Sequence, residues 1–156
     1  MSSAHITLEP KILVIDNEPD IAYILRRWLL DNGIFAAAFT QPKEAFMHWK
    51  EHSTEYCLVL SDIRMPGLTG FEIARSIRKI NPDVKIILFS AFEINMQEFE
   101  KVMPNTRVDE FIEKPINRDK LLQVIRKHIG NSKNLPTSRS PNAQVNQMEE
   151  NANAKT

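Results

Sequence analysis

Four polar side chains in this sequence stand where apolar stretches end. They are two carboxylates, a hydroxyl and an ammonium: Asp16, Asp62, Ser90 and Lys114. A carboxylate can attack phosphorus when nearby cations neutralise the charge on the phosphoryl oxygens. Loops often begin with a polar residue, which explains any one of these positions but is a poor explanation for all four. The pattern therefore indicates a site for phosphoryl chemistry.

Each of these side chains suits a separate task in that chemistry. Asp16 and Glu18 can supply oxygen ligands for Mg2+ beside Asp62. The Lys114 ammonium is a compact charge that can pair with a phosphoryl oxygen, and the Ser90 hydroxyl can donate a hydrogen bond to another. Carboxylates that lie close together resist joint ionisation, so these acids should favour a bound cation.

Short apolar stretches alternate with amphipathic stretches along most of the chain. The predicted strands are 11–16, 34–39, 57–62, 85–90 and 109–113. This alternation is typical of an α/β fold in which a parallel sheet carries helices on both faces. The carboxyl ends of such strands border a crevice where the strand order reverses. The four polar residues stand at those ends, so the fold would gather them into one pocket.

Helical spacing of apolar residues predicts a helix after each strand. Pro42 suits a first helical turn, and Thr69 and Asn117 can cap two other helices. The residues that are expected to end helices are Gly33, Asn81-Pro82, Pro104 and Gly130. The stripe of the fourth helix is weaker and consists of Ile94, Phe99, Val102 and Met103.

The bulk composition is that of one soluble domain. The 156 residues are 42% hydrophobic and 26% charged, with no formal net charge, so no general attraction to nucleic acid or anionic membranes is expected. No apolar stretch approaches a membrane span, and Met1–Pro10 lacks a signal-peptide pattern, so we expect a cytoplasmic protein. Cys57 alone can form neither an internal disulfide nor a zinc cage, and it is expected in the core.

The chain divides into a domain at 10–130 and a tail at 131–156. The tail is rich in Asn, Gln, Ser, Pro and Lys and has few large apolar side chains. Such a segment cannot bury enough surface to offset its ordering entropy, so we expect a disordered polar tail. No DNA-binding motif follows residue 130, so we expect no nucleic-acid partner and action through protein contacts.

Four motifs resemble those of the receiver domains of two-component response regulators. They are KILVIDNEPD at 11–20, SDIRMPGLTG at 61–70, LFSA at 88–91 and FIEKP at 111–115. They occur in the expected order at the expected strand ends, and the match covers about residues 10–130. The resemblance implies a single-domain receiver with a doubly wound, flavodoxin-like fold and five parallel strands in the order 2-1-3-4-5.

The resemblance also implies a role for each matching residue. Asp62 would be the phosphoacceptor, Lys114 the lysine that contacts the phosphoryl group, and Ser90 the switch hydroxyl. Phe111 matches the aromatic switch position of the family. The implied Mg2+ ligands are Asp16, Asn17, Asp62 and the backbone carbonyl of Arg64, with Glu18 as a further candidate. The Lys114–Pro115 peptide bond would be cis, as is usual in this family.

One position departs from the family pattern. Receiver domains usually carry two adjacent acids after the first strand, and here the pair is Asp16 and Asn17. An amide oxygen can ligate Mg2+ but brings no charge, so Mg2+ should bind more weakly. Glu18 follows in the motif and could point away from the ion. Either phosphorylation survives with a higher magnesium demand, which we favour, or the domain is a degenerate receiver that only binds other proteins.

The implied function is a signalling switch, not an enzyme with a separate substrate. A sensor histidine kinase or a phosphotransfer protein would phosphorylate Asp62, and the chain could catalyse its own phosphorylation and dephosphorylation. Ser90 would then move inward and Phe111 would change rotamer. The face formed by the fourth helix, fifth strand and fifth helix would change its affinity for a downstream protein. Homodimer formation stays open.

Two other classes of protein fit the sequence less well. An aspartyl phosphohydrolase of the haloacid-dehalogenase type usually has a second aspartate two residues after its nucleophile, where this chain has Arg64. It also usually has a cap insertion, for which this chain has no room. A flavodoxin-like cofactor binder needs a phosphate loop rich in glycine and hydroxyl groups, where this chain has the acidic segment 16–19.

Overall fold

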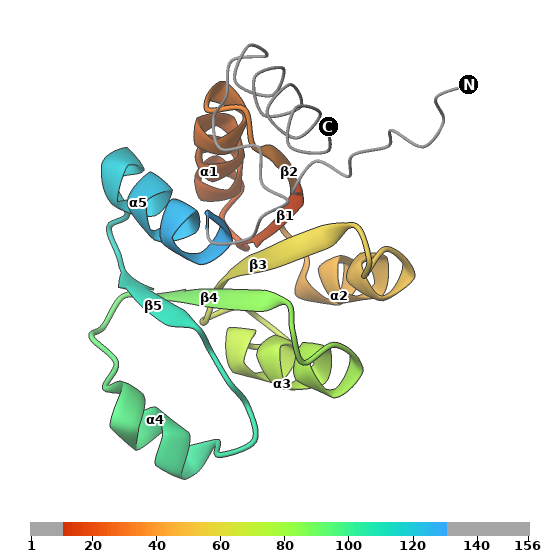
Figure 1. Cartoon of the computed structure of the whole chain (residues 1–156), viewed down its shortest axis with the longest axis vertical. Helices are drawn as coiled ribbons and strands as arrows, with labels where there is room; N and C mark the ends of the chain where they lie inside the picture. The colour runs from red at the N-terminus through yellow and green to blue at the C-terminus, as the bar shows by residue number, and fades with distance from the viewer. Residues whose placement is uncertain (1–10, 131–156) are drawn as a thin grey trace, which may run out of the picture.

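The computed structural model describes residues 11–130; the first ten residues and the expected tail at 131–156 lie outside the described residues. Strands and helices alternate along the described part (Figure 1). The strands are β1 (Lys11–Ile15), β2 (Phe35–Phe39), β3 (Tyr56–Asp62), β4 (Lys85–Ser90) and β5 (Glu110–Glu113). The helices are α1 (Pro19–Asp31), α2 (Pro42–Glu51), α3 (Gly70–Ile80), α4 (Met96–Val102) and α5 (Arg118–Ile129). Every predicted strand and helix is present.

The five strands form one parallel sheet in the order β2-β1-β3-β4-β5, which confirms the predicted fold class and strand order. The inner strands β1, β3 and β4 are apolar on both sides of the pleat because helices cover both faces of the sheet. The strand order reverses between β1 and β3. The chain therefore leaves these two strands in opposite directions, which leaves a crevice at their carboxyl ends.

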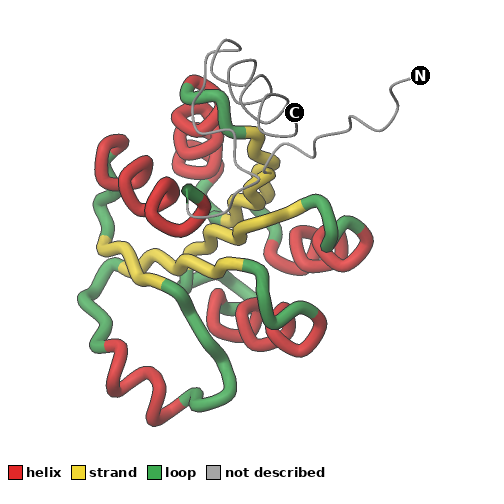
Figure 2. Tube along the Cα trace, viewed as in Figure 1, coloured by secondary structure: helices red, strands yellow, loops and turns green. Residues whose placement is uncertain are grey.

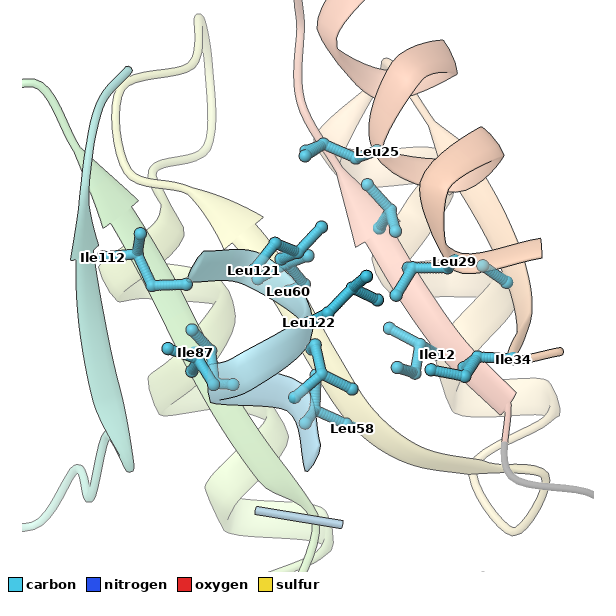
Figure 3. Packing of buried hydrophobic residues seen from close by; sticks show 14 of the residues in the cluster. Ile12, Leu25, Leu29, Ile34, Leu58, Leu60, Ile87, Ile112, Leu121 and Leu122 are labelled. Atoms are coloured by element: carbon cyan, nitrogen blue, oxygen red, sulfur yellow. The ribbon is translucent and has the colours of Figure 1, made fainter. Parts of the chain in front are cut away.

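The core consists of two apolar clusters on opposite faces of the sheet. Leu25 and Leu29 of α1 and Leu121 of α5 pack with strand residues in one cluster (Figure 3). The other cluster holds the buried side chains of α2 and α3, including Trp49. Cys57, expected in the core, is only partly buried at the margin of the first cluster, and burial raises the pKa of its thiol to about 11.

Two predicted caps begin the helices that follow β3 and β5. The Thr69 side chain accepts the backbone N–H of Glu72, and the Glu72 carboxylate accepts the backbone N–H of Thr69. The Asn117 side chain accepts the backbone N–H of Lys120. The loop after β3 therefore ends at Thr69, and the loop after β5 ends at Asn117. No helix within residues 11–130 is long and apolar enough to cross a membrane.

The fourth helix departs from its predicted apolar stripe. α4 has seven residues, and loops precede and follow it (Figure 2). Phe99 is buried, and Ile94 and Met103 are partly buried, but Val102 is 80% exposed. Val102 belongs to the predicted weaker stripe but does not share the burial of Phe99, because a helix of two turns docks through a single side chain and not through a long stripe.

Candidate functional site

Asp16 and Asp62 lie beside each other at the carboxyl ends of neighbouring strands. β1 and β3 pair with Ile15 opposite Ser61, so the next residue of each strand emerges at the same edge of the sheet. Both residues are buried, with Asp16 0% and Asp62 6% exposed. Two buried carboxylates this close together require a positive charge to compensate them.

Lys114 supplies that positive charge. Its ammonium lies 3.3 Å from Oδ2 of Asp16 and 3.3 Å from Oδ2 of Asp62. Burial opposes the charge on Lys114, but the attraction of the two carboxylates outweighs burial and raises its pKa. The backbone N–H of Lys114 donates to the carbonyl of Ser90 at 2.7 Å, so the backbone of Lys114 is anchored to the end of β4.

Burial dominates the electrostatics of Asp16. Desolvation raises the pKa of its carboxyl group, and the neighbouring Asp62 charge adds to the rise. The backbone N–H of Glu18, which donates to Oδ1 at 2.9 Å, and the ammonium of Lys114 act in the opposite direction without cancelling it. The charge of Asp16 is thus incompletely compensated, which favours binding of a further cation.

Ser90 stands next to the carboxylates but faces a different partner. β3 and β4 pair with Asp62 opposite Phe89, which places Ser90 at the same edge of the sheet. Its hydroxyl accepts the backbone N–H of Phe92 at 3.0 Å. Among the hydrogen bonds of the described residues, none joins the Ser90 hydroxyl to Asp62 or Lys114. The hydroxyl is therefore held by its own loop.

Two aromatic contacts flank these polar groups. The Arg64 guanidinium lies 4.9 Å from the ring centroid of Phe92 and so links the loops that follow β3 and β4. Phe111 is partly buried on the face of the sheet that α3 and α4 cover, and its ring meets that of Phe99 edge to face. The sequence gives no sign of the contacts to Phe92 and Phe99, because they depend on the course of two loops.

Gly70 is a site residue that the sequence analysis did not single out. A Cβ atom there would lie 2.4 Å from the backbone carbonyl oxygen of Asp62 and 2.9 Å from Cα of Ile63. The N–H of Gly70 also donates to the carbonyl of Ile63 at 2.9 Å. Glycine thus allows the start of α3 to press against the end of β3. The one sequence signal for this role is that Gly70 closes the second motif.

The donor groups fit Mg2+ if neutral ligands complete its shell. Within residues 11–130, no three His, Cys, Asp or Glu side chains are grouped so as to hold a metal ion. Asp16 and Asp62 offer two carboxylates, and Mg2+ is commonly held by one or two carboxylates together with other oxygens and water. The Asn17 amide and the Arg64 carbonyl are the predicted neutral donors. Glu18 is exposed and lines a cavity beside α1 instead of forming a three-acid group.

That cavity, of about 340 Å3, directly adjoins Lys114. Its apolar lining comes from α1 and from the loop between β5 and α5: Ile21, Ile24, Leu25, Trp28, Pro115 and Ile116. The Lys114–Pro115 peptide in this loop is cis, as the resemblance implies. The sequence did not predict the cavity, because its size depends on how closely the loop approaches α1.

A model of the response regulator receiver domain matches residues 12–126. The chain belongs to the response regulator receiver family. It is therefore a signalling domain of the two-component type. The chemotaxis protein CheY of Bacillus subtilis (strain 168) is 28% identical to this receiver over 118 residues, which cover 75% of this chain and 95% of CheY. Several longer curated relatives match over only 11–25% of their length, so their other activities do not carry over.

Solved receiver structures share this fold. The receiver domain protein from Clostridium thermocellum has a TM-score of 0.70 and 27% identity, covering 80% of this chain and 97% of that chain. TrrA from Thermotoga maritima, solved in complex with Mg2+-BeF, has a TM-score of 0.64 and 35% identity, covering 76% of this chain and 97% of that chain. Receiver domains of this family typically bind Mg2+, which agrees with the donor groups around Asp16 and Asp62.

Proposed function

We propose that this receiver accepts a phosphoryl group on Asp62 from a sensor histidine kinase or a phosphotransfer protein. The observation that supports this most directly is the contact of one ammonium, that of Lys114, with both Asp62 and Asp16. Lys114 can exchange its contact with Asp62 for one with a phosphoryl oxygen while Asp16 still holds it. The cation is thus already in place for the charge that the transfer brings.

The transfer exchanges one bond to phosphorus for another. A carboxylate oxygen of Asp62 attacks phosphorus, an O–P bond forms, and the P–N bond to the donor histidine breaks. The electron pair of that bond stays on the imidazole, which takes up a proton. Bound Mg2+ would neutralise charge on the phosphoryl oxygens, with Asp16, Asn17, Asp62 and the Arg64 carbonyl as ligands. Attack of water on the same phosphorus would restore Asp62 and end the signal.

Ser90 would be the first residue to respond to the phosphoryl group. Its hydroxyl now accepts the N–H of Phe92. A phosphoryl oxygen is a strong acceptor, so the hydroxyl would turn and donate to it. Phe111 would then change rotamer into the space that Ser90 leaves, and the face formed by α4, β5 and α5 would change its affinity for a downstream protein.

The cavity beside Lys114 is suited to the docking of the phosphoryl donor. A donor histidine has to come within bonding distance of Asp62, so the donor must cover the protein surface around Lys114. An apolar side chain of the donor can then enter the cavity between α1 and the following loop. Ile24, which lines this cavity and is 40% exposed, would be part of the contact.

Intact-mass analysis after incubation with acetyl phosphate across a Mg2+ series tests the proposed phosphorylation. We expect a Mg2+-dependent phosphoryl adduct that is absent in Asp62→Ala. Asp20→Ala, which removes an exposed acid at the start of α1, is the control and should keep the adduct.

Asn17 favours one alternative function, a receiver that binds its partners without phosphorylation. The amide at this position leaves two carboxylates, Asp16 and Asp62, to hold the metal ion. This alternative predicts no adduct at any Mg2+ concentration. It also predicts that wild type and Asp62→Ala bind a partner equally well, so the same two proteins distinguish the functions.

A further inference from the structure

The Lys114 ammonium has a third neighbour besides Asp16 and Asp62. Its Nζ lies over the ring of Phe89, 5.6 Å from the ring centroid. A cation within about 6 Å of a ring centroid is attracted by the negative charge of the ring face. Phe89 is 0% exposed and the Lys114 side chain is 21% exposed, so little water competes for this contact.

The backbone holds Phe89 and Lys114 at the same end of β4. β3 and β4 pair with Phe89 opposite Asp62, and the Ile63 N–H donates to the Phe89 carbonyl at 3.1 Å. The N–H of Lys114 donates to the carbonyl of Ser90, the residue after Phe89. The Phe89 ring also belongs to the apolar cluster that α1 and α5 cover. The ring is therefore a fixed surface against which the ammonium rests.

A ring face suits this ammonium better than a further acid or an aliphatic side chain would. Lys114 needs its charge for a phosphoryl oxygen, and a third carboxylate would compete for that charge. An aliphatic side chain would give the partly buried ammonium nothing in place of its lost hydration. The face of the Phe89 ring attracts the ammonium but carries no formal charge. The ring thus holds the cation without neutralising it.

We propose that Phe89 is a positioning residue for phosphoryl transfer, whose ring face keeps the Lys114 ammonium where it can reach the phosphoryl group. This inference rests on the proposed function, in which Lys114 exchanges its contact with Asp62 for one with a phosphoryl oxygen. Its contacts with Asp16 and Phe89 can persist during that exchange. An ammonium held on two sides samples fewer positions, so it lies more often where it neutralises the phosphoryl charge. Phe89 acts through Lys114 and not on phosphorus.

Graded fluorination of the Phe89 ring in the full chain tests this inference. Each fluorine atom withdraws electron density from the ring face, while the shape of the side chain changes little. Proteins with mono-, di- or trifluorinated phenylalanine at position 89 are compared with the wild type. Intact mass gives the rate of adduct formation with acetyl phosphate and Mg2+. We expect this rate to fall with every added fluorine, by about two- to thirtyfold over the series, the range of a cation–ring contact.

Two further changes separate attraction by the ring from packing. Fluorination of Phe46 is the matched control, because the Lys50 ammonium lies 5.1 Å from the centroid of that ring. Both residues belong to α2, which carries none of the proposed site residues, so the rate should stay unchanged. Phe89→Leu keeps an apolar side chain without a ring face and should be about as slow as the trifluorinated protein. The fluorinated series decides alone if Phe89→Leu does not fold.

The NMR signals of the Lys114 side chain report the contact directly. Nuclei over the face of an aromatic ring are shifted upfield, so Phe89→Leu should move these signals downfield. Lys114→Gln identifies them, because they are absent from its spectrum. A role of Phe89 in the apolar cluster alone would not produce this shift.

Two results would overturn the inference while the proposed function stands. In the first, the wild type forms the adduct and the series fluorinated at Phe89 reaches or exceeds its rate. In the second, Phe89→Leu leaves the Lys114 signals in place. If the wild type forms no adduct at any Mg2+ concentration, the proposed phosphorylation of Asp62 fails, and the role of Phe89 in it fails as well. The wild-type adduct therefore distinguishes the two failures.

Discussion

The Lys114 ammonium lies 3.3 Å from Oδ2 of Asp62, so the proposed phosphoacceptor is in contact with its counter-charge before any phosphoryl group arrives. The same ammonium also forms an ion pair with Asp16. One cation shared by two buried carboxylates leaves negative charge that nothing else in the contact compensates. This excess charge attracts a metal ion, and it also lowers the stability of the metal-free domain.

Asp16→Asn should therefore stabilise the metal-free protein at pH 7. Burial raises the pKa of Asp16, so folding disfavours its charged form. A carboxyl group whose pKa is raised by folding stabilises the folded state at pH values below its unfolded-state pKa. This stabilisation is lost as the pH rises through its folded-state pKa. We expect the variant to gain about 0.5–2 kcal/mol in denaturant unfolding with EDTA, a typical gain when a functional group is replaced.

The stability gained through Asp16→Asn should depend on pH. The gain from Asp16→Asn should shrink as the pH falls through the folded-state pKa of Asp16, because the wild-type carboxyl then becomes neutral as well. The variant should also lose its Mg2+-dependent adduct. Asp20→Asn, at an exposed position, should change neither property. If Asp16→Asn instead loses stability, the contacts of the Asp16 carboxylate with Lys114 and Glu18 stabilise the folded domain by more than burial of the charge destabilises it.

Asn17→Asp should lower the Mg2+ concentration required for phosphorylation. One more carboxylate near the ion should tighten binding by about tenfold or more, equivalent to at least about 1.4 kcal/mol. Calorimetric titration with Mg2+ measures this directly. Glu18→Gln is the companion variant and should leave the affinity unchanged, because Glu18 lines the cavity beside α1. Weaker binding in Glu18→Gln would instead identify Glu18 as a ligand.

The sequence predicted the strands and the polar residues at their ends because both depend on local patterns. β3 and β4 are apolar on both sides of the pleat, and Asp62 and Ser90 end these strands. Once the strands are parallel, their ends must meet at one edge of the sheet. This is why residues far apart in the chain, such as Asp16 and Lys114, could be assigned to one site.

The features that the sequence did not predict depend on contacts between distant segments. The need for glycine at position 70 arises from the backbone of Asp62, which no local pattern specifies. Val102 fitted a helical stripe, yet it is exposed because α4 docks through Phe99 alone. The pairing of Arg78 with Asp109 likewise joins two charged residues that, in the sequence, look like ordinary surface positions.

Arg78→Met should cost about 3 kcal/mol or more of stability, because it leaves a nearly buried carboxylate without its main partner. The Arg78 and Asp109 side chains are 6% and 10% exposed, and the guanidinium also donates to backbone carbonyls. Denaturant unfolding measures the loss. Arg75→Met, on the same helix but exposed, is the matched control and should stay within about 0.5 kcal/mol of wild type. Equal stability of the two variants would show that Lys85 and Arg107 compensate Asp109 without Arg78.

Ile24→Glu should slow phosphorylation by a protein donor without affecting phosphorylation by acetyl phosphate. Ile24 lines the cavity beside Lys114, and a carboxylate there would oppose entry of an apolar donor side chain. With a purified histidine kinase or phosphotransfer protein that phosphorylates the wild type, we expect a rate about tenfold lower, equivalent to about 1.4 kcal/mol of docking free energy. Tyr23→Glu is the control, because Tyr23 is exposed on the same helix but does not line the cavity. If both variants accept phosphoryl groups from the protein donor at the wild-type rate, the donor does not use this cavity.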